Sequence, residues 1–210
     1  RVDNMKYELN KLYNMDCMKA MEDIPDNYFE LAIVDPPYGI GANKMTLGNG
    51  KRKIYRGKND WDKSSPNKKY FRELDRVSKN QIIWGGNYYE LPPNRHFLIW
   101  RKLTISEDFT MAMCEYAWSS FDDNAKWIEI APQDSNRFHP TQKPIKLYKW
   151  QLKNYAEEGD TILDTHLGSA SIAVACWDMG HDLTGYEIDE NYFKKDCERV
   201  KQYTNQMKLF

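Results

Sequence analysis

The sequence predicts an α/β fold, a Rossmann-like, mostly parallel sheet with helices on both faces. Strand-like and helix-like segments alternate along most of the 210 residues. Residues 29–35, "FELAIVD", form a continuous apolar run, which is typical of a strand covered on both faces. Residues 160–180, "DTILDTHLGSASIAVACWDMG", indicate a strand, a glycine turn and a helix. This length suits one domain with a sizeable core, so we predict a single domain over residues 1–210.

The first half of the chain gives the expected elements from local pattern. Residues 11–16 predict a short strand, and residues 17–24 a helix that brings Met18 and Met21 to one face. The apolar strand 29–35 follows. Ser65-Pro66 then predicts the start of a helix through residue 78, since proline suits the first helical position. Two further apolar runs predict strands over 81–87 and 96–102.

The second half continues the alternation. Residues 113–121 and 125–131 are expected to be extended and to include an antiparallel edge. A helix is predicted over 141–156, with Gly159 at its end. After the strand, turn and helix of 160–180, residues 181–189 predict a strand and residues 190–206 a closing helix.

A basic segment interrupts this order. Between Lys44 and Lys69 the chain carries nine Lys or Arg residues against two acids, while the net charge of the whole chain is −1. Any attraction for polyanions must therefore come from a local patch. We predict a basic loop insertion over residues 43–69. The alternative is a merely solvated surface loop.

The cysteines and the apolar runs restrict the class of protein. The four cysteines are widely spaced, without a C-x-x-C pair, which argues against a zinc site and against a disulfide framework. We expect reduced thiols, a cytoplasmic location and no metal. No apolar run is long enough to cross a bilayer, and the first residues lack the apolar core of a signal peptide.

Two acids follow neighbouring strands near the end of the chain. Asp164 precedes the glycine turn at Gly168, and Glu187 ends the next strand about twenty residues later. Small residues let a backbone approach a nucleoside, and a carboxylate in the second position can accept hydrogen bonds from ribose hydroxyls. The pattern alone is weak, because Asp164 can cap a turn and Glu187 can be a surface acid. The chain has no full G-x-G-x-x-G and no P-loop lysine at the turn, which argues against a dinucleotide enzyme or a P-loop.

The tetrapeptide Asp35-Pro36-Pro37-Tyr38 follows the apolar strand 29–35. Two prolines restrict the backbone behind a carboxylate and an aromatic ring. One interpretation is a strand-terminating turn in which Asp35 caps its own backbone. The second interpretation is a site that holds a planar polar group between acceptors and a ring.

Together, "DPPY", "HPTQKP" (139–144), "ILDTHLGSAS" (162–171) and "GYEID" (185–189) resemble the S-adenosylmethionine-dependent DNA amino-methyltransferases. The catalytic tetrapeptide precedes the glycine turn, as in the permuted β group of that family. The resemblance runs from about Leu12 to Val200 and implies a class I methyltransferase fold. The glycine turn departs from the family's D-P-F-x-G-S-G-T, because Thr165, His166 and Ala170 replace proline, phenylalanine and the second glycine.

The resemblance implies that the tetrapeptide is catalytic. Asp35 and the carbonyl of Pro36 would accept hydrogen bonds from an exocyclic amine and offset its developing positive charge. Pro36 and Pro37 would fix these acceptors before the substrate enters. Tyr38 would stack on a base flipped out of its duplex.

The resemblance also implies a cofactor set for S-adenosylmethionine. Asp16 would contact the adenine amine, although an N-cap of the following helix is an equal alternative. Lys143 would face the methionine carboxylate, Thr141 would cap the next helix, and Glu187 would bind the ribose. The methionine part would lie near Asp164, His166, Gly168 and Ser169.

The expected partner is double-stranded DNA. Four side chains of the basic segment would contact phosphate: Lys51, Arg52, Lys53 and Arg56. Residues 105–138 would be a reduced target-recognition region, which favours a short site, a homodimer or another protein's help. Aspartate in the first position of the tetrapeptide favours N6 of adenine over N4 of cytosine. The chain could also act on RNA or on a protein amide, or it could be a non-catalytic binding module.

Overall fold

The computed structural model describes residues 11–41, 62–108, 111–132 and 137–207. In this part of the chain eight strands form one sheet in the order β1-β8-β7-β2-β3-β5-β4-β6. The strands are β1 (Lys11–Asn14), β2 (Phe29–Val34), β3 (Ser78–Trp84), β4 (Phe97–Lys102), β5 (Cys114–Ser119), β6 (Lys126–Ile130), β7 (Thr161–Asp164) and β8 (Asp182–Glu187). Among the described strands only β5 runs antiparallel to its neighbours, β3 and β4. The mostly parallel sheet is confirmed.

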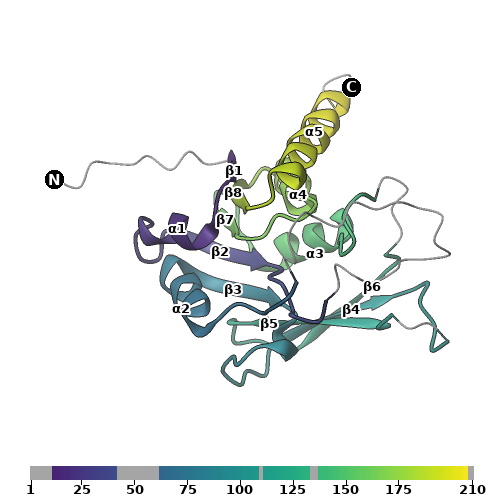
Figure 1. Ribbon diagram of the computed structural model, residues 1–210. Coiled ribbons are helices and arrows are strands. Elements are labelled where there is room, and N and C mark those ends of the chain that lie inside the picture. Colours follow the sequence, from purple (N-terminus) through teal and green to yellow (C-terminus); the bar gives the residue numbers. More distant parts are fainter. Residues whose placement is uncertain (1–10, 42–61, 109–110, 133–136, 208–210) are drawn as a thin grey trace.

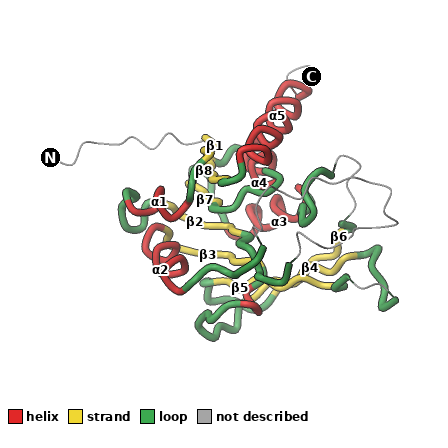
Figure 2. Tube along the Cα trace, in the orientation of Figure 1, coloured by secondary structure: helices red, strands yellow, loops and turns green. Residues whose placement is uncertain are grey.

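Helices cover both faces of the sheet, as predicted (Figures 1 and 2). On one face lie α1 (Cys17–Glu22) and α2 (Lys68–Val77), and on the other α3 (Ile145–Tyr155), α4 (Ser171–Met179) and α5 (Glu190–Met207). A short 3-10 helix, η2 (Gly86–Tyr88), follows β3. The strands β2, β7 and β8 thus have apolar side chains on both faces, which explains the unbroken apolar run of β2.

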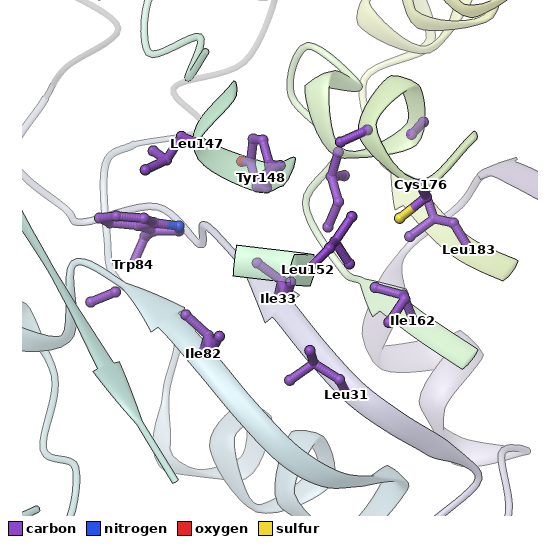
Figure 3. Close-up of a cluster of buried hydrophobic side chains, with 14 of the residues drawn as sticks. Leu31, Ile33, Ile82, Trp84, Leu147, Tyr148, Leu152, Ile162, Cys176 and Leu183 are labelled. Carbon is purple, nitrogen blue, oxygen red and sulfur yellow. The ribbon is translucent and has the colours of Figure 1, made fainter. Parts of the chain in front are cut away.

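Two apolar clusters fill the spaces between the sheet and the helices. In the larger cluster, side chains of β2 and β3 pack against α3 and α4 (Figure 3). The strands contribute Leu31, Ile33, Ile82 and Trp84, and α3 contributes the fully buried Leu152. The second joins the opposite side chains of the same strands to α1 and α2. Each fully buried Leu or Ile contributes about 1.5–3 kcal/mol to the free energy of unfolding. The clusters hold β2 rigidly, and the tetrapeptide follows directly from it.

Three local expectations were wrong in detail. The helix expected after Pro66 begins at Lys68, because the side chain of Asn67 accepts hydrogen bonds from the N–H groups of residues 69 and 70. The antiparallel strand β5 lies inside the sheet, and the edge strand β6 runs parallel to β4.

The helix expected from residue 141 begins at Ile145, with Pro144 at its N-cap position and no side-chain cap. Thr141 instead contacts the ring of His139. The extended conformation of Pro144 keeps residues 139–144 outside the helix. None of the described helices is long and apolar enough to cross a membrane.

Candidate functional site

A pocket opens where the parallel strands β7, β8 and β1 end, the edge at which open α/β sheets bind ligands. Its cavity measures about 480 Å³. We call it the acid-lined pocket, because Asp16 and Glu187 both line it. The other lining residues are Met15, Cys17, Met18, Pro37, Ser64, Ser65, Pro66, Asn67, Tyr70, Thr165, His166, Tyr186 and Ile188. Among these described residues there is no Lys or Arg, so the pocket suits an uncharged nucleoside better than a phosphate.

Asp16 lies on one side of the pocket, directly before α1. Its Oδ1 accepts the N–H of Met18 at 2.9 Å, so the predicted N-cap interpretation is confirmed. A carboxylate has two oxygens and about four lone pairs. The cap therefore leaves Asp16 with acceptor capacity toward the pocket, and both interpretations of this residue can hold together.

Glu187 ends β8 and is 9% exposed. Its Oε2 accepts the N–H of Gly168 at 3.0 Å, and its Oε1 accepts the N–H of Asp189 at 2.8 Å. Burial raises the pKa of Glu187 above its ordinary value, while these backbone N–H groups lower it again. The glycine turn and the acid at the end of β8 thus form one hydrogen-bonded unit.

The glycine turn itself has an unusual backbone. Gly168 has φ +57°, and Ala170, at the N-cap position of α4, has φ +51°. Ala170 occupies the position of the second glycine in the family pattern. An L residue in this left-handed region costs about 1–2 kcal/mol relative to glycine. In this turn the left-handed conformation is therefore adopted by an alanine as well as by a glycine.

The strip 139–144 packs on this turn. A Cβ added at Gly168 would lie 3.5 Å from the His139 ring, so the ring lies directly over the glycine. Burial, with Arg137 and Lys143 nearby, lowers the pKa of His139 to about 3, and the neutral ring accepts from Thr141. The structure therefore brings the "HPTQKP" segment and the glycine turn together.

Asp35 follows β2 and meets a buried ammonium group. Lys143 Nζ lies 2.5 Å from Asp35 Oδ2, and the Lys143 side chain is 2% exposed. Burial raises the pKa of Asp35 above its ordinary value, and the charge of Lys143 opposes that rise. The amine predicted to face a cofactor carboxylate is paired here with the carboxylate of the tetrapeptide.

The Tyr38 side chain points back to Asp35. Its hydroxyl donates to Asp35 Oδ1 at 2.7 Å and accepts from Lys143 at 3.2 Å. Its ring stacks on that of Tyr88, with centroids 5.0 Å apart and an interplanar angle of 16°. This separation leaves no room for another ring, so a base can stack on that face of Tyr38 only after Tyr88 has moved.

The carbonyl groups of the two prolines are also hydrogen-bonded. The Tyr89 hydroxyl donates to the Pro36 oxygen at 2.7 Å and lies 3.2 Å from the Pro37 oxygen. A carbonyl oxygen has two lone pairs, so Pro36 can accept a second hydrogen bond. Tyr89 fixes the direction of that second acceptor.

The remaining predicted cofactor residues differ in exposure. His166 lines the acid-lined pocket, and its N–H donates to Asp164 Oδ1 at 3.0 Å. Asp164 is 2% exposed, and burial raises its pKa to about 8. Ser169 is buried and its hydroxyl lies 3.1 Å from that of Ser171. Asp164 and Ser169 are therefore buried residues that stabilise the glycine turn through hydrogen bonds to His166 and Ser171.

The ends of the basic segment are held beside the tetrapeptide. The carboxylate of Asp62 accepts the N–H of Gly39 at 2.8 Å, and its backbone oxygen accepts the N–H of Gly41 at 3.2 Å. The four predicted phosphate contacts (Lys51, Arg52, Lys53 and Arg56) lie outside the described residues. Of the predicted recognition segment 105–138, residues 114–119 and 126–130 are strands of the sheet.

Sequence reasoning missed four residues of the site. Glu115 and Lys102 extend the charges behind Lys143, and Tyr88 and Tyr89 contact Tyr38 and the proline carbonyls. Charged residues inside otherwise apolar strands gave a signal for Glu115 and Lys102. In the described residues no group of three or more His, Cys, Asp or Glu side chains is arranged to hold a metal ion.

Comparison with known proteins relates this geometry to a family. A family model described as DNA methylase matches residues 79–198. "Putative methylase YubD" of Escherichia coli strain K12 is 24% identical over 212 residues, covering 91% of this chain and 90% of that protein. "Type II methyltransferase M2.LlaDCHI" of Lactococcus lactis subsp. cremoris is 24% identical over 240 residues, with 91% and 89% covered.

Solved structures share the fold of this chain. The "PvuII DNA methyltransferase (cytosine-N4-specific)" has a TM-score of 0.62 at 13% identity, covering 93% of this chain and 91% of that one. The "M1.HpyAVI-SAM complex" has a TM-score of 0.58 at 16% identity, covering 90% and 98%. This likeness confirms the Rossmann-like fold.

Proposed function

We propose that this chain, which belongs to the DNA methylase family of the matching model, methylates the N6 amine of adenine in DNA. The family match spans more than half of the chain. S-adenosylmethionine is the methyl donor of this family, and the fold is of the class I methyltransferase type with the permuted motif order. The target base, the site residues and the partners are the proposed part.

The hydrogen-bond acceptors of the acid-lined pocket match the hydrogen-bond donors of the adenosine part of S-adenosylmethionine. Ribose hydroxyls and an adenine amine are hydrogen-bond donors, and the pocket offers the carboxylates of Glu187 and Asp16. Ile188 is 65% exposed and Met15 38% exposed, which gives the pocket apolar surface for a ring. We assign the ribose to Glu187, the adenine amine to Asp16, and the methionine end to the turn of Asp164, His166, Gly168 and Ser169.

One observation carries the proposed reaction: Pro37 lines the acid-lined pocket, and Asp35 lies two residues before it at the end of β2. When bound, S-adenosylmethionine supplies a methyl group on a positively charged sulfur. The Asp35 carboxylate and the second lone pair of the Pro36 carbonyl accept hydrogen bonds from the exocyclic amine. They favour a lone pair on nitrogen and offset the charge that develops there. Because β2 is rigid and Tyr89 orients the carbonyl, both acceptors are positioned in advance.

The base reaches these acceptors only when it leaves its duplex, which costs a few kcal/mol. We propose that it stacks on Tyr38 in place of Tyr88, with about 1–3 kcal/mol from stacking. Adenine is favoured over cytosine because the first residue of the tetrapeptide is aspartate. Lys143 is reassigned from the cofactor carboxylate to Asp35, because its amine is already paired there.

The proposed partner is double-stranded DNA. The ends of the basic segment, held by Asp62 beside Gly39 and Gly41, would bring its lysines and arginines to the phosphates around the flipped base. The non-strand parts of 105–138 would read the target. A second copy of the chain would add contacts that this short segment lacks. A cytoplasmic location is consistent with the four cysteines, which are unpaired in the structure.

The test is transfer of a labelled methyl group from S-adenosylmethionine to mixed-sequence duplex DNA, followed by digestion to nucleosides. Label on N6-methyladenine is expected, and Asp35→Ala, which removes the acceptor, should abolish it while cofactor affinity changes only a few-fold. The matched control is Asp26→Ala, since Asp26 is exposed, pairs with Arg76 and precedes β2, at the opposite end of that strand from Asp35. Label on N4-methylcytosine would overturn the choice of base. Cofactor binding without label on DNA would overturn DNA as the acceptor.

A further inference from the structure

Asp35 is the first of four charged side chains of alternating sign that lie in a row. Lys143 Nζ is 2.5 Å from Asp35 Oδ2 and 3.1 Å from Glu115 Oε2, and Lys102 Nζ is 2.7 Å from Glu115 Oε1. The side chains of Lys143 and Lys102 are 2% and 7% exposed, and that of Glu115 is 22% exposed. We call Asp35, Lys143, Glu115 and Lys102 the charge row.

The members of the charge row come from four different segments. Asp35 follows β2, Lys143 precedes α3, Glu115 is on β5 and Lys102 ends β4. The Glu115 carboxylate pairs with two ammonium groups, those of Lys143 and Lys102. The row balances to zero charge, which reduces the cost of burying it.

A lysine side chain is long and flexible, so it keeps its amine beside one particular carboxylate only when other contacts restrict its conformation. Lys143 Nζ has three polar neighbours (Asp35, Glu115 and Tyr38), and it lies 5.2 Å from the centroid of the Trp84 ring. Glu115 is the only one of these three neighbours that belongs neither to the tetrapeptide nor to its strand. It can therefore hold the amine through a contact that does not depend on the tetrapeptide.

We propose that Glu115, supported by Lys102, is a positioning residue that holds the Lys143 ammonium against Asp35 and so keeps the Asp35 carboxyl group in the orientation of an acceptor. The role rests on the proposed function, because Asp35 is the acceptor of the reaction only if that function holds. Glu115 itself touches no substrate.

The charge states agree with this role. Burial alone would raise the pKa of Glu115, but Lys143 and Lys102 hold it at about 2, so Glu115 is ionised. Burial alone would lower the pKa of Lys143, but Asp35 and Glu115 raise it above its ordinary value, so the amine keeps its charge.

Other titratable groups also face the charge row and must be considered in a pH experiment. The phenols that face Asp35 are Tyr38, Tyr89 and Tyr148, all with raised pKa values, so they stay protonated. Asp164 interacts with both Asp35 and Lys143, and its pKa is about 8. His139 interacts with Lys143 and is neutral, with a pKa of about 3. These groups are the same in wild type and in a Glu115 variant, so a difference between the two reports the loss of Glu115.

The test is Glu115→Gln, which keeps the shape and removes the charge. Without Glu115 the pKa of Lys143 should fall, and the pKa of Asp35, which Glu115 raises, should fall as well. Both limbs of the profile of kcat against pH should therefore move to lower pH, by about 1–3 pH units for a close charge pair. The value of kcat at its optimum should also fall, by up to about 100-fold for a displaced acceptor.

The matched control is Glu129→Gln on the neighbouring strand β6. Glu129 is also a carboxylate in an ion pair, with Arg101, but it lies outside the charge row. Its profile against pH should match that of wild type. A Glu115→Gln profile with unmoved limbs, whatever its kcat, would overturn the proposal and leave Glu115 a structural residue.

Glu115→Gln leaves Lys102 without its partner and can lower stability, so a second variant is needed. Glu115→Gln combined with Lys102→Met removes both charges, which often restores stability at a buried pair. If Glu115 is a positioning residue, the double variant recovers its Tm and still has shifted limbs. Recovery of the wild-type profile together with the Tm would overturn the role.

A measurement without substrate separates this proposal from the proposed function. The lysine side chains, labelled with ¹⁵N, can be titrated by NMR, with Lys143→Met to assign the Lys143 signal. A lower pKa of Lys143 in Glu115→Gln is expected even if the protein methylates no DNA. In that case the charge row would be real and the assigned reaction would be wrong. An unchanged pKa in an active enzyme would refute the proposal alone.

Discussion

The replacement Glu187→Gln tests the acid-lined pocket most directly. Each Glu187 oxygen accepts a backbone N–H, from Gly168 and from Asp189. Glutamine has one acceptor oxygen, so one of these N–H groups loses its acceptor, which should lower the free energy of unfolding by about 1–3 kcal/mol. Two ribose hydroxyls would also lose a charged acceptor. At roughly 1–2 kcal/mol each, S-adenosylmethionine should bind about 30- to 900-fold more weakly.

Isothermal titration calorimetry of S-adenosylmethionine measures this affinity, and urea unfolding measures the cost in stability. The control is Glu190→Gln, because Glu190 lies three residues further along the chain and pairs with Lys194 at the surface. The control should bind like wild type. An unchanged affinity in Glu187→Gln would refute the ribose assignment. If weaker binding disappears at a temperature where the variant is fully folded, Glu187 acts only through stability.

Two further replacements test other parts of the structure. Gly85→Ala should lower the free energy of unfolding by at least about 1–2 kcal/mol, because Gly85 has φ +72°. It should also abolish methyl transfer while cofactor affinity is retained, because the new Cβ would lie 2.2 Å from the Tyr38 ring. Gly180→Ala, with φ +74° and nothing within 4 Å, is its control, and equal activity in both variants would contradict the contact with Tyr38. Asp196 is fully buried, and neither of its side-chain oxygens has a hydrogen-bond partner in the described residues. Burial raises its pKa to about 9, so the Asp196 carboxyl group is protonated in the folded protein. In the unfolded chain it loses this proton above about pH 4. Stability should therefore fall from about pH 4 to pH 9, and Asp196→Asn should remove this slope and add about 1–3 kcal/mol at pH 7 in urea unfolding, whereas an unchanged slope would mean that Asp196 is ionised.

The alternation of apolar runs was sufficient to predict the sheet and its two helical layers. Each strand and α-helix of the described chain was expected near its observed position, and the burial of β2, β7 and β8 on both faces is visible in the sequence as apolar runs. The 3-10 helix η2 was not expected, because the strand predicted over 81–87 ends at Trp84. The order of the strands was not predictable in this way. No local pattern indicated that β5 lies inside the sheet, since its place depends on pairing with β3, from which η2 and β4 separate it in the sequence.

The site was predictable only in part, for a similar reason. The acids at strand ends were found because parallel strands bring their carboxyl ends together, and the structure places Asp16, Glu187 and His166 in one pocket. The partner of Lys143 was not found, because a lysine side chain is long enough to reach several groups. Tyr88 was not found, because the local sequence gives no sign that its ring stacks on that of Tyr38.

The position of β1 at the edge of the sheet, paired with β8, affects how the protein is made. On the ribosome β1 emerges before the other described strands, but β8, its only described partner strand, emerges after all of them. The half of the sheet that contains β2 to β6 can form first, and β1 must wait unpaired until β7 and β8 have joined. Asp16 and Glu187 then meet across a very long loop, a slow kind of closure. The acid-lined pocket therefore forms only after the other described strands have emerged, and a ligand bound there would stabilise only chains in which β1 and β8 have paired.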